Sequence, residues 1–185
     1  DLQNGGFSSE LDNFTTAAAN FTVSENATAL TEASGSSHTD TFTVKLDSEP
    51  VGNVVISIVA SDASEVSASP SALTFSSDNW STAQTVNLEA FDDDLSDGTI
   101  TSAVTVGINK DQTKDSEYDK LKSHSISATT SDDEGIPSVT LTATIVSLVE
   151  DEETLTLTVN MSLASGVDTT VDFTTSGTAE RDADY

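Results

Sequence analysis

The residues in this sequence that could do chemistry are carboxylates, and they gather in short acidic runs. Segment 90–99 reads AFDDDLSDGT, in which three consecutive aspartates follow an apolar stretch and a fourth precedes a glycine. Like charges at this spacing repel one another, so the segment is either a solvated loop or the surroundings of a cation. The acidic runs comprise Glu25, Asp62, Glu65, Asp92–Asp94, Asp97, Asp132–Glu134, Glu150–Glu153, Asp182 and Asp184.

Calcium is the cation that such runs favour. Ca²⁺ takes roughly six to eight oxygen ligands, which carboxylates on several flexible loops can supply. Mg²⁺ is less favoured, because it keeps more of its water. Zinc and copper prefer thiolate or imidazole ligands, and the chain has no cysteine and only two histidines, His38 and His124. The segment is not an EF-hand loop, because Gly98 falls one place too late after Asp92. We therefore expect Ca²⁺, against the alternative of solvated acidic loops.

The overall charge restricts the partners. The 185 residues include 32 Asp and Glu against 6 Lys and Arg, a formal net charge of −26. Nucleic acid and anionic membrane surfaces both require a positive face, so we expect neither as a partner. No apolar run reaches the roughly 20 residues of a membrane helix, and the absence of cysteine excludes a disulfide framework. Because the sequence starts without Met and stops abruptly at Tyr185, we interpret it as a piece of a longer protein.

The elements that must position these carboxylates are β-strands. Apolar and polar residues alternate in segments 40–46, 85–90, 103–108 and 154–163, and segment 54–60 is a continuous apolar run. Turn signals containing Gly, Pro, Asp and Ser separate these segments, and no stretch shows a capped helical stripe. The pattern predicts an all-β, immunoglobulin-like antiparallel β-sandwich. Strand ends that are distant in sequence meet at one pole of such a fold.

The chain also repeats itself. Residues 14–25 can be laid over 139–150 without a gap, and residues 42–58 over 157–173, with about ten additional residues between the blocks in the first copy. We therefore predict one complete module and a truncated second module. In this division, residues 1–13 are the tail of a preceding segment, 14–134 are module 1, 135–138 are a linker and 139–185 are module 2.

The order of these pieces carries a resemblance. The stretches VSEN, DTFTVKLDSEPVGNVVISI, SPSALTF, NWSTAQTVNLEAFDDD and SISATTSDDEG, followed by SGTAERDADY in the second copy, resemble Calx-β-type repeats of large bacterial surface proteins. The resemblance runs from about residue 14 onward and lies in order and spacing, since each piece alone is weak.

This resemblance implies an immunoglobulin-like sandwich that holds Ca²⁺ at one pole. Its implied ligands in module 1 are Glu25, Asp92, Asp93, Asp94, Asp132 and Asp133. Module 1 departs from the family at the "DY" position, where Asp62 or Glu65 could substitute. In module 2 the implied ligands are Glu150 and Asp184, and the later acidic runs are missing, so the second site is expected to be incomplete.

The predicted function is therefore structural. We expect a calcium-binding module pair of a secreted or cell-surface protein, which Ca²⁺ makes rigid. Its expected partners are neighbouring modules, and a cell-surface glycan or matrix is a further candidate. One alternative is an accessory carbohydrate-binding or spacer domain of a polysaccharide-degrading enzyme, which would bind through Trp80 or the lysine-rich segment 109–122. Another is a filament subunit, which would self-assemble through strand exchange at module 2. An enzyme is not expected, because neither histidine lies in a nucleophile motif.

Overall fold

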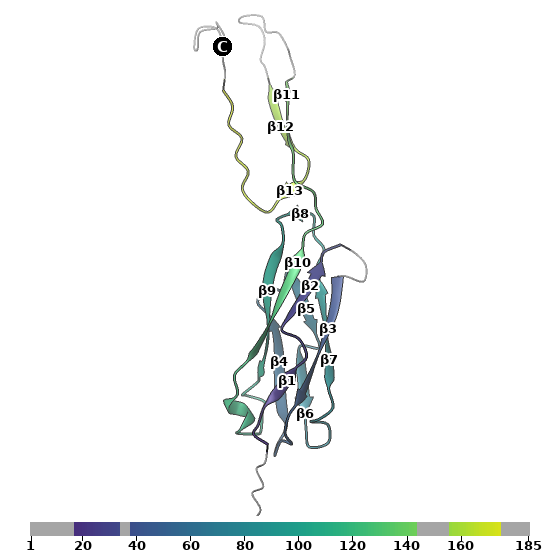
Figure 1. The fold of residues 1–185 in the computed structure, drawn as a ribbon. Helices are drawn as coiled ribbons and strands as arrows, with labels where there is room; N and C mark the ends of the chain where they lie inside the picture. Colours follow the sequence, from purple (N-terminus) through teal and green to yellow (C-terminus); the bar gives the residue numbers. More distant parts are fainter. Residues whose placement is uncertain (1–16, 34–37, 144–155, 175–185) are drawn as a thin grey trace, which may run out of the picture.

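The computed structural model describes residues 17–33, 38–143 and 156–174, and its core is a sandwich of two β-sheets (Figure 1). The four-stranded sheet has the order β1-β3-β7-β5 and the five-stranded sheet the order β2-β10-β9-β4-β6. The first contains β1 (Phe21–Val23), β3 (Thr39–Leu46), β7 (Gln84–Ala90) and β5 (Val66–Ser69). The second contains β2 (Ala27–Thr31), β10 (His124–Ser131), β9 (Ile100–Ile108), β4 (Val54–Ala60) and β6 (Ala72–Phe75). The predicted all-β, immunoglobulin-like sandwich is confirmed.

Alternation in the sequence decides which side chains enter the core. In β3, Phe42, Val44 and Leu46 are at most 1% exposed, whereas Lys45 between them faces solvent. The apolar run of β4 buries Val54, Val55 and Ile56 in succession, as expected of a central strand. Trp80 packs against this core from its edge, which is the structural role that an isolated tryptophan before a strand suggests.

The strand directions define two poles. Within the two sheets of the sandwich, neighbouring strands are antiparallel except β2 and β10, which are parallel from Ala27↔Ser127 to Thr31↔Ser131. The strands β2, β4, β7 and β10 therefore all end at one pole, which we call the acidic pole. The opposite pole, which we call the lysine pole, contains the β9–β10 connection with the short 3₁₀ helix η2 (Tyr118–Lys120).

Tyr118 anchors the lysine pole. Its ring is fully buried, and its hydroxyl donates a hydrogen bond of 2.6 Å to the backbone oxygen of Ser48. Asp115 fixes the same turn by accepting hydrogen bonds from the backbone amides of Val51 and Glu117. No helix among the described residues is long and apolar enough to cross a membrane.

A two-stranded ribbon follows the sandwich beyond the acidic pole (Figure 1). It consists of β11 (Val139–Ala143) and β12 (Leu157–Met161), and every residue of both strands is exposed. The chain then returns to the sandwich, where β13 (Ala164–Ser165) pairs in parallel with β8 (Leu95–Ser96). The amide of Gly166 continues this pairing with a hydrogen bond of 3.3 Å to the backbone oxygen of Ser96.

The ribbon repeats the first strands of the sandwich in register. Val139 lies opposite Met161 and Leu141 opposite Val159, as Phe21 lies opposite Leu46 and Val23 opposite Val44. The backbone bond from the Asp47 amide to the Asn20 oxygen, 2.9 Å long, recurs from Ser162 to Ser138 at the same length. The two strand pairs therefore share the same register and the same closing backbone hydrogen bond.

This register gives a different correspondence from the sequence overlay of residues 14–25 on 139–150. The paired strands place Phe21, rather than Phe14, in correspondence with Val139. Continued along the sequence, this correspondence aligns Glu150 with Glu32, whereas the overlay aligns it with Glu25. Short runs of Thr, Val and Ala can be overlaid at several phases, whereas the hydrogen-bond register of the strand pairs allows one.

Candidate metal centre

Glu32 is the most deeply buried carboxylate at the acidic pole. It follows β2 directly, and its amide extends the β2–β10 ladder by a 3.0 Å hydrogen bond to the backbone oxygen of Ser131. Only 4% of the residue is exposed, and its Oε2 atom has no hydrogen-bond partner. A buried carboxylate oxygen without a partner is costly unless a proton or a cation reaches it.

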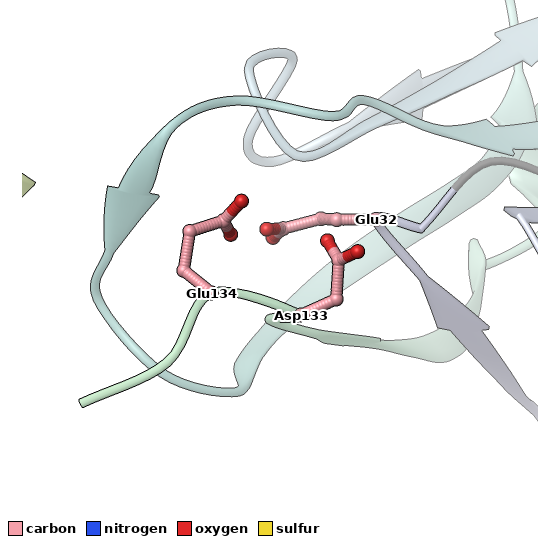
Figure 2. Close-up of side chains that lie close together, drawn as sticks. All are labelled: Glu32, Asp133 and Glu134. Carbon is pink, nitrogen blue, oxygen red and sulfur yellow. The ribbon is translucent and has the colours of Figure 1, made fainter. Parts of the chain in front are cut away.

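The end of β10 brings two further carboxylates to Glu32. One carboxylate oxygen each from Glu32, Asp133 and Glu134 lie within 4.8 Å of one another. Figure 2 shows the three side chains pointing toward a common space. The parallel pairing of β2 and β10 produces this arrangement, because the two strands end side by side.

Asp132 organises the loop around this group. Its Oδ1 accepts a 2.7 Å hydrogen bond from the Glu134 amide and its Oδ2 accepts a 2.6 Å bond from the Gly98 amide. Gly98 has a φ of +84°, a conformation that side chains rarely adopt. Asp132 thus joins the end of β10 to the β8–β9 turn, and the glycine permits the turn.

A second set of carboxylates comes from the β4–β5 and β7–β9 segments. Glu65 is 8% exposed and its Oε2 has no hydrogen-bond partner, and Asp97 likewise has a buried, unpartnered Oδ1. Asp93 accepts a 2.7 Å hydrogen bond from the Leu95 amide, which folds the loop before β8. The amide of Phe91 bonds to the backbone oxygen of Glu65 at 3.0 Å and links the two segments.

Electrostatics joins the two sets into one cluster. Burial, and then the charges of Glu65, Asp97, Asp132 and Asp93, raise the pKa of Glu32 from 4.5 to about 7. Burial, and then the charges of Asp97, Asp62 and Asp93, raise the pKa of Glu65. We define the acidic cluster as Glu32, Glu65, Asp93, Asp97, Asp132, Asp133 and Glu134.

Burial and hydrogen bonding shift the pKa values of Glu134 and Asp132 at this pole. Burial raises the pKa of Glu134, and its hydrogen bond with Asp132 adds to the rise. The bond from the Gly98 amide lowers the pKa of Asp132, so this carboxylate stays ionised. The cluster therefore combines carboxylates that stay charged with carboxylates that favour a proton in the absence of a cation.

The described lysines do not neutralise the cluster. Lys110, Lys114, Lys120 and Lys122 lie in the β9–β10 connection, and Lys45 lies near the end of β3, all toward the lysine pole. Lys120 forms its ion pair there, with Glu117 at 2.6 Å. Among the described residues, no lysine therefore lies at the acidic pole.

The sequence predicted part of this cluster. The structure brings together Glu65, Asp93, Asp132 and Asp133. Asp62 lies beside them, exposed, with its Oδ1 accepting bonds from Ser64 that lower its pKa. Asp92 and Asp94 belong to the same loop and face solvent.

Glu25 is placed elsewhere. It precedes β2, at the opposite end of that strand from Glu32, and the His124 Nε2 lies 3.0 Å from its backbone oxygen. Glu150 and Asp184 lie outside the described residues. Sequence reasoning did not select Glu32, Asp97 or Glu134 as ligands, although Asp97 and Glu134 stand within acidic runs that it noted. The signal for Glu32 is its alignment with Glu150 once the strand register is known.

The cluster fits a hard divalent cation. All of its donors are carboxylate oxygens, they come from four separate segments, and four of these oxygens, in Glu32, Glu65, Asp97 and Glu134, are buried without a hydrogen-bond partner. Ca²⁺ prefers this donor set and tolerates its irregular geometry, whereas zinc would require nitrogen or sulfur ligands. The glycine at position 166 brings a further segment against the cluster, because a Cβ there would lie 2.5 Å from the Cβ of Asp97.

The chain is similar to some solved structures at low sequence identity. No protein-family model and no curated protein matches the chain. Among solved structures, the chain is similar to the class 5 fimbrial chaperone CfaA, with a TM-score of 0.45 and 11% identity over 77% of this chain and 67% of that one.

Two other similarities are of the same kind. The periplasmic chaperone SfaE gives a TM-score of 0.44 at 9% identity, covering 62% of this chain and 59% of that chain. WR4, an MSP family member of C. elegans, gives 0.40 at 7% identity, covering 60% of this chain and 97% of that one. The chain thus spans about 59% of the length of SfaE. At these scores the similarities carry no argument about function.

Proposed function

We propose that this chain is a calcium-binding structural module pair of an extracellular protein, in which Ca²⁺ at the acidic pole makes the junction between sandwich and ribbon rigid. The observation that carries the proposal is the burial of Glu32 and Glu65, each more than nine-tenths buried with an unpartnered oxygen, within the acidic cluster. A cation between these carboxylates would remove the cost of burying their charges. The role is one of binding and architecture rather than catalysis.

The cluster residues would act by connecting segments. Glu32 holds the end of β2, Glu65 the β4–β5 loop, and Asp133 and Glu134 the end of β10. Asp93 and Asp97 flank β8, the strand to which β13 pairs, so a cation that fixes these two side chains also fixes the strand on which the return from the ribbon docks. Ca²⁺ supplies the positive charge, and the protein supplies the oxygens and their placement.

The location and partners follow from the same chemistry. Extracellular calcium modules bind Ca²⁺ with dissociation constants of about 0.1–1 mM, which suits a site built from exposed loops. The resemblance to Calx-β-type repeats supports a secreted or cell-surface protein whose partners are neighbouring modules, with a glycan or matrix beyond them. The proposed glycan contact through Trp80 has less support, because Trp80 packs against the core.

Thermal unfolding of the full chain with calcium and with chelator tests the proposal. At a calcium concentration of about ten to a hundred times the dissociation constant, the linked stabilisation is roughly 1.4–2.7 kcal/mol, which corresponds to a rise of about 4–10 °C in Tm. Glu32→Gln is expected to lose most of this rise. Glu25→Gln makes the same change at the opposite end of β2 and is expected to keep it. Equal melting in calcium and chelator would exclude the proposed site.

A further inference from the structure

Thr130 carries the one neutral group among the buried side-chain oxygens that lack a hydrogen-bond partner. Six such oxygen atoms occur among the described residues. Five belong to carboxylates, in Glu32, Glu65, Asp97, Asp119 and Glu134, and the sixth is the hydroxyl oxygen of Thr130. An ionised carboxylate only accepts hydrogen bonds, whereas a hydroxyl can donate one. Within this set, Thr130 is therefore the group that can donate a hydrogen bond to an ionised carboxylate.

The alternation of β10 places this hydroxyl on the inner face of the sandwich. Ile126, Ala128 and Thr130 are each 0% exposed, while Ser127 and Ser131 face solvent. Thr130 is thus the polar residue among the three buried positions of β10. A buried hydroxyl without a partner destabilises a fold, and valine would fill the same space without that cost. The hydroxyl therefore requires a partner.

The pairing of β2 with β10 places Glu32 diagonal to Thr130. Thr130 lies opposite Leu30, and Glu32 follows Leu30 by two residues. Leu30 is 3% exposed and Glu32 is 4% exposed, so both side chains face the interior as Thr130 does. Diagonal neighbours on adjacent strands lie about 7–8 Å apart, a separation that a long glutamate side chain can bridge. The unpaired donor and the unpaired acceptor thus share one face.

The residues directly opposite Thr130 offer no alternative partner in their side chains. Ile100 of β9 lies opposite Thr130 on one side and Leu30 of β2 on the other, and both side chains are apolar. Asp132, which belongs to the acidic cluster, follows Thr130 by two residues. Thr130 therefore stands where the apolar interior gives way to the carboxylates of the acidic cluster.

We propose that Thr130 is a positioning residue of the calcium site, whose hydroxyl donates a hydrogen bond to one oxygen of the Glu32 carboxylate and orients the other toward the cation. The inference rests on the proposed function and adds to it a group that does not itself bind the ion. Metal ligands in proteins commonly have such a partner, which fixes their orientation. When the site is filled, Glu32 is ionised and its carboxylate accepts this bond, so both groups then have a partner.

Calcium titration calorimetry of the full chain and of Thr130→Val tests the inference. Valine keeps the branched shape of threonine and removes the hydroxyl, so the dissociation constant for Ca²⁺ should rise by about 10–100-fold. In chelator, the Tm of Thr130→Val should equal or exceed that of the parent, because the variant no longer buries an unpaired hydroxyl. A purely structural role of Thr130 would not combine weaker calcium binding with an equally stable metal-free fold.

Two further variants supply the controls. Thr130→Ser keeps the hydroxyl and should hold the dissociation constant within about threefold of the parent, even though the lost methyl group lowers the Tm. Thr129→Val makes the same substitution on the outer face of β10, where residue 129 is only partly buried, and should leave calcium affinity unchanged.

The outcomes separate this inference from the proposed function. A parent chain that binds no Ca²⁺ refutes the calcium site itself, and the role of Thr130 with it. If the parent binds Ca²⁺ and Thr130→Val binds it equally well, Thr130 has no positioning role while the calcium site stands. The same conclusion follows if Thr130→Ser or Thr129→Val binds Ca²⁺ as weakly as Thr130→Val, or if Thr130→Val lowers the Tm in chelator.

Discussion

Replacing Glu32 with Gln should stabilise the metal-free sandwich at alkaline pH. The folded state raises the pKa of Glu32 from 4.5 to about 7. A carboxyl with a raised folded pKa favours its protonated form in the folded state. The destabilisation that ionised Glu32 causes is therefore absent below the unfolded-state pKa of 4.5. It grows as the pH rises from 4.5 to about 7 and is complete above pH 7. A shift of about 2.5 units corresponds to roughly 3 kcal/mol at 1.36 kcal/mol per unit.

Urea unfolding in chelator measures this difference. The single tryptophan, Trp80, packs against the core and reports the transition by fluorescence. At pH 8, Glu32→Gln should be more stable than the parent by roughly 3 kcal/mol, and the gap should shrink toward zero as the pH falls to about 4.5. The amide of Gln can also donate to the carboxylates around it, which preserves the local packing.

Calcium should reverse the order of the two proteins. When calcium fills the site, its binding raises the free energy of unfolding of the parent. The variant lacks one ligand and gains less from calcium, so the parent becomes about as stable as the variant or more stable. A variant that is less stable than the parent in chelator at pH 8 would refute the reasoning, because Glu32 would then be stabilising the fold without a cation. A stability gap that does not change with pH would refute it as well.

Further predictions concern the two poles. Tyr118→Phe removes the buried hydroxyl that bonds to Ser48 and should lower the free energy of unfolding by about 1–2 kcal/mol in urea titrations, with calcium binding unchanged. Gly166→Val should displace β13 from β8, because even a Cβ lies 2.5 Å from that of Asp97, and faster hydrogen exchange at β13 with an unchanged sandwich Tm would show it. Asp132→Asn should weaken calcium binding in titration calorimetry. It removes the negative charge of the carboxylate whose two oxygens accept hydrogen bonds from the Gly98 and Glu134 amides.

The sandwich could be predicted because its signal is local. Alternation in segment 40–46 and the apolar run 54–60 correspond to β3 (Thr39–Leu46) and β4 (Val54–Ala60) almost residue for residue. Period-two patterning is the direct expression of a strand with one buried face, so it survives without knowledge of neighbours. The parallel pairing of β2 with β10 has no such local signature and was not predicted.

That missing pairing explains why the predicted ligand set includes Glu25, whereas the acidic cluster includes Glu32. Asp132 and Asp133 could be selected from their position after an apolar strand, but the partner they meet is fixed by which strand lies beside β10. Family spacing pointed to Glu25, before β2, whereas the parallel register places the end of β2 and Glu32 at the acidic pole. The pairing of β2 with β10 therefore determines that Glu32, and not Glu25, belongs to the acidic cluster.

The parallel β2–β10 pair also determines how the sandwich would respond to tension. The described chain begins near the lysine pole and leaves the sandwich at the acidic pole, so a pull on its two ends draws β2 and β10 in opposite directions along their length. The five paired positions between Ala27 and Thr31 are then loaded together in shear rather than opened one at a time. A cation held by Glu32 on one strand end and by Asp133 and Glu134 on the other would act as a lock against that sliding, so calcium should raise the unfolding force in single-molecule pulling.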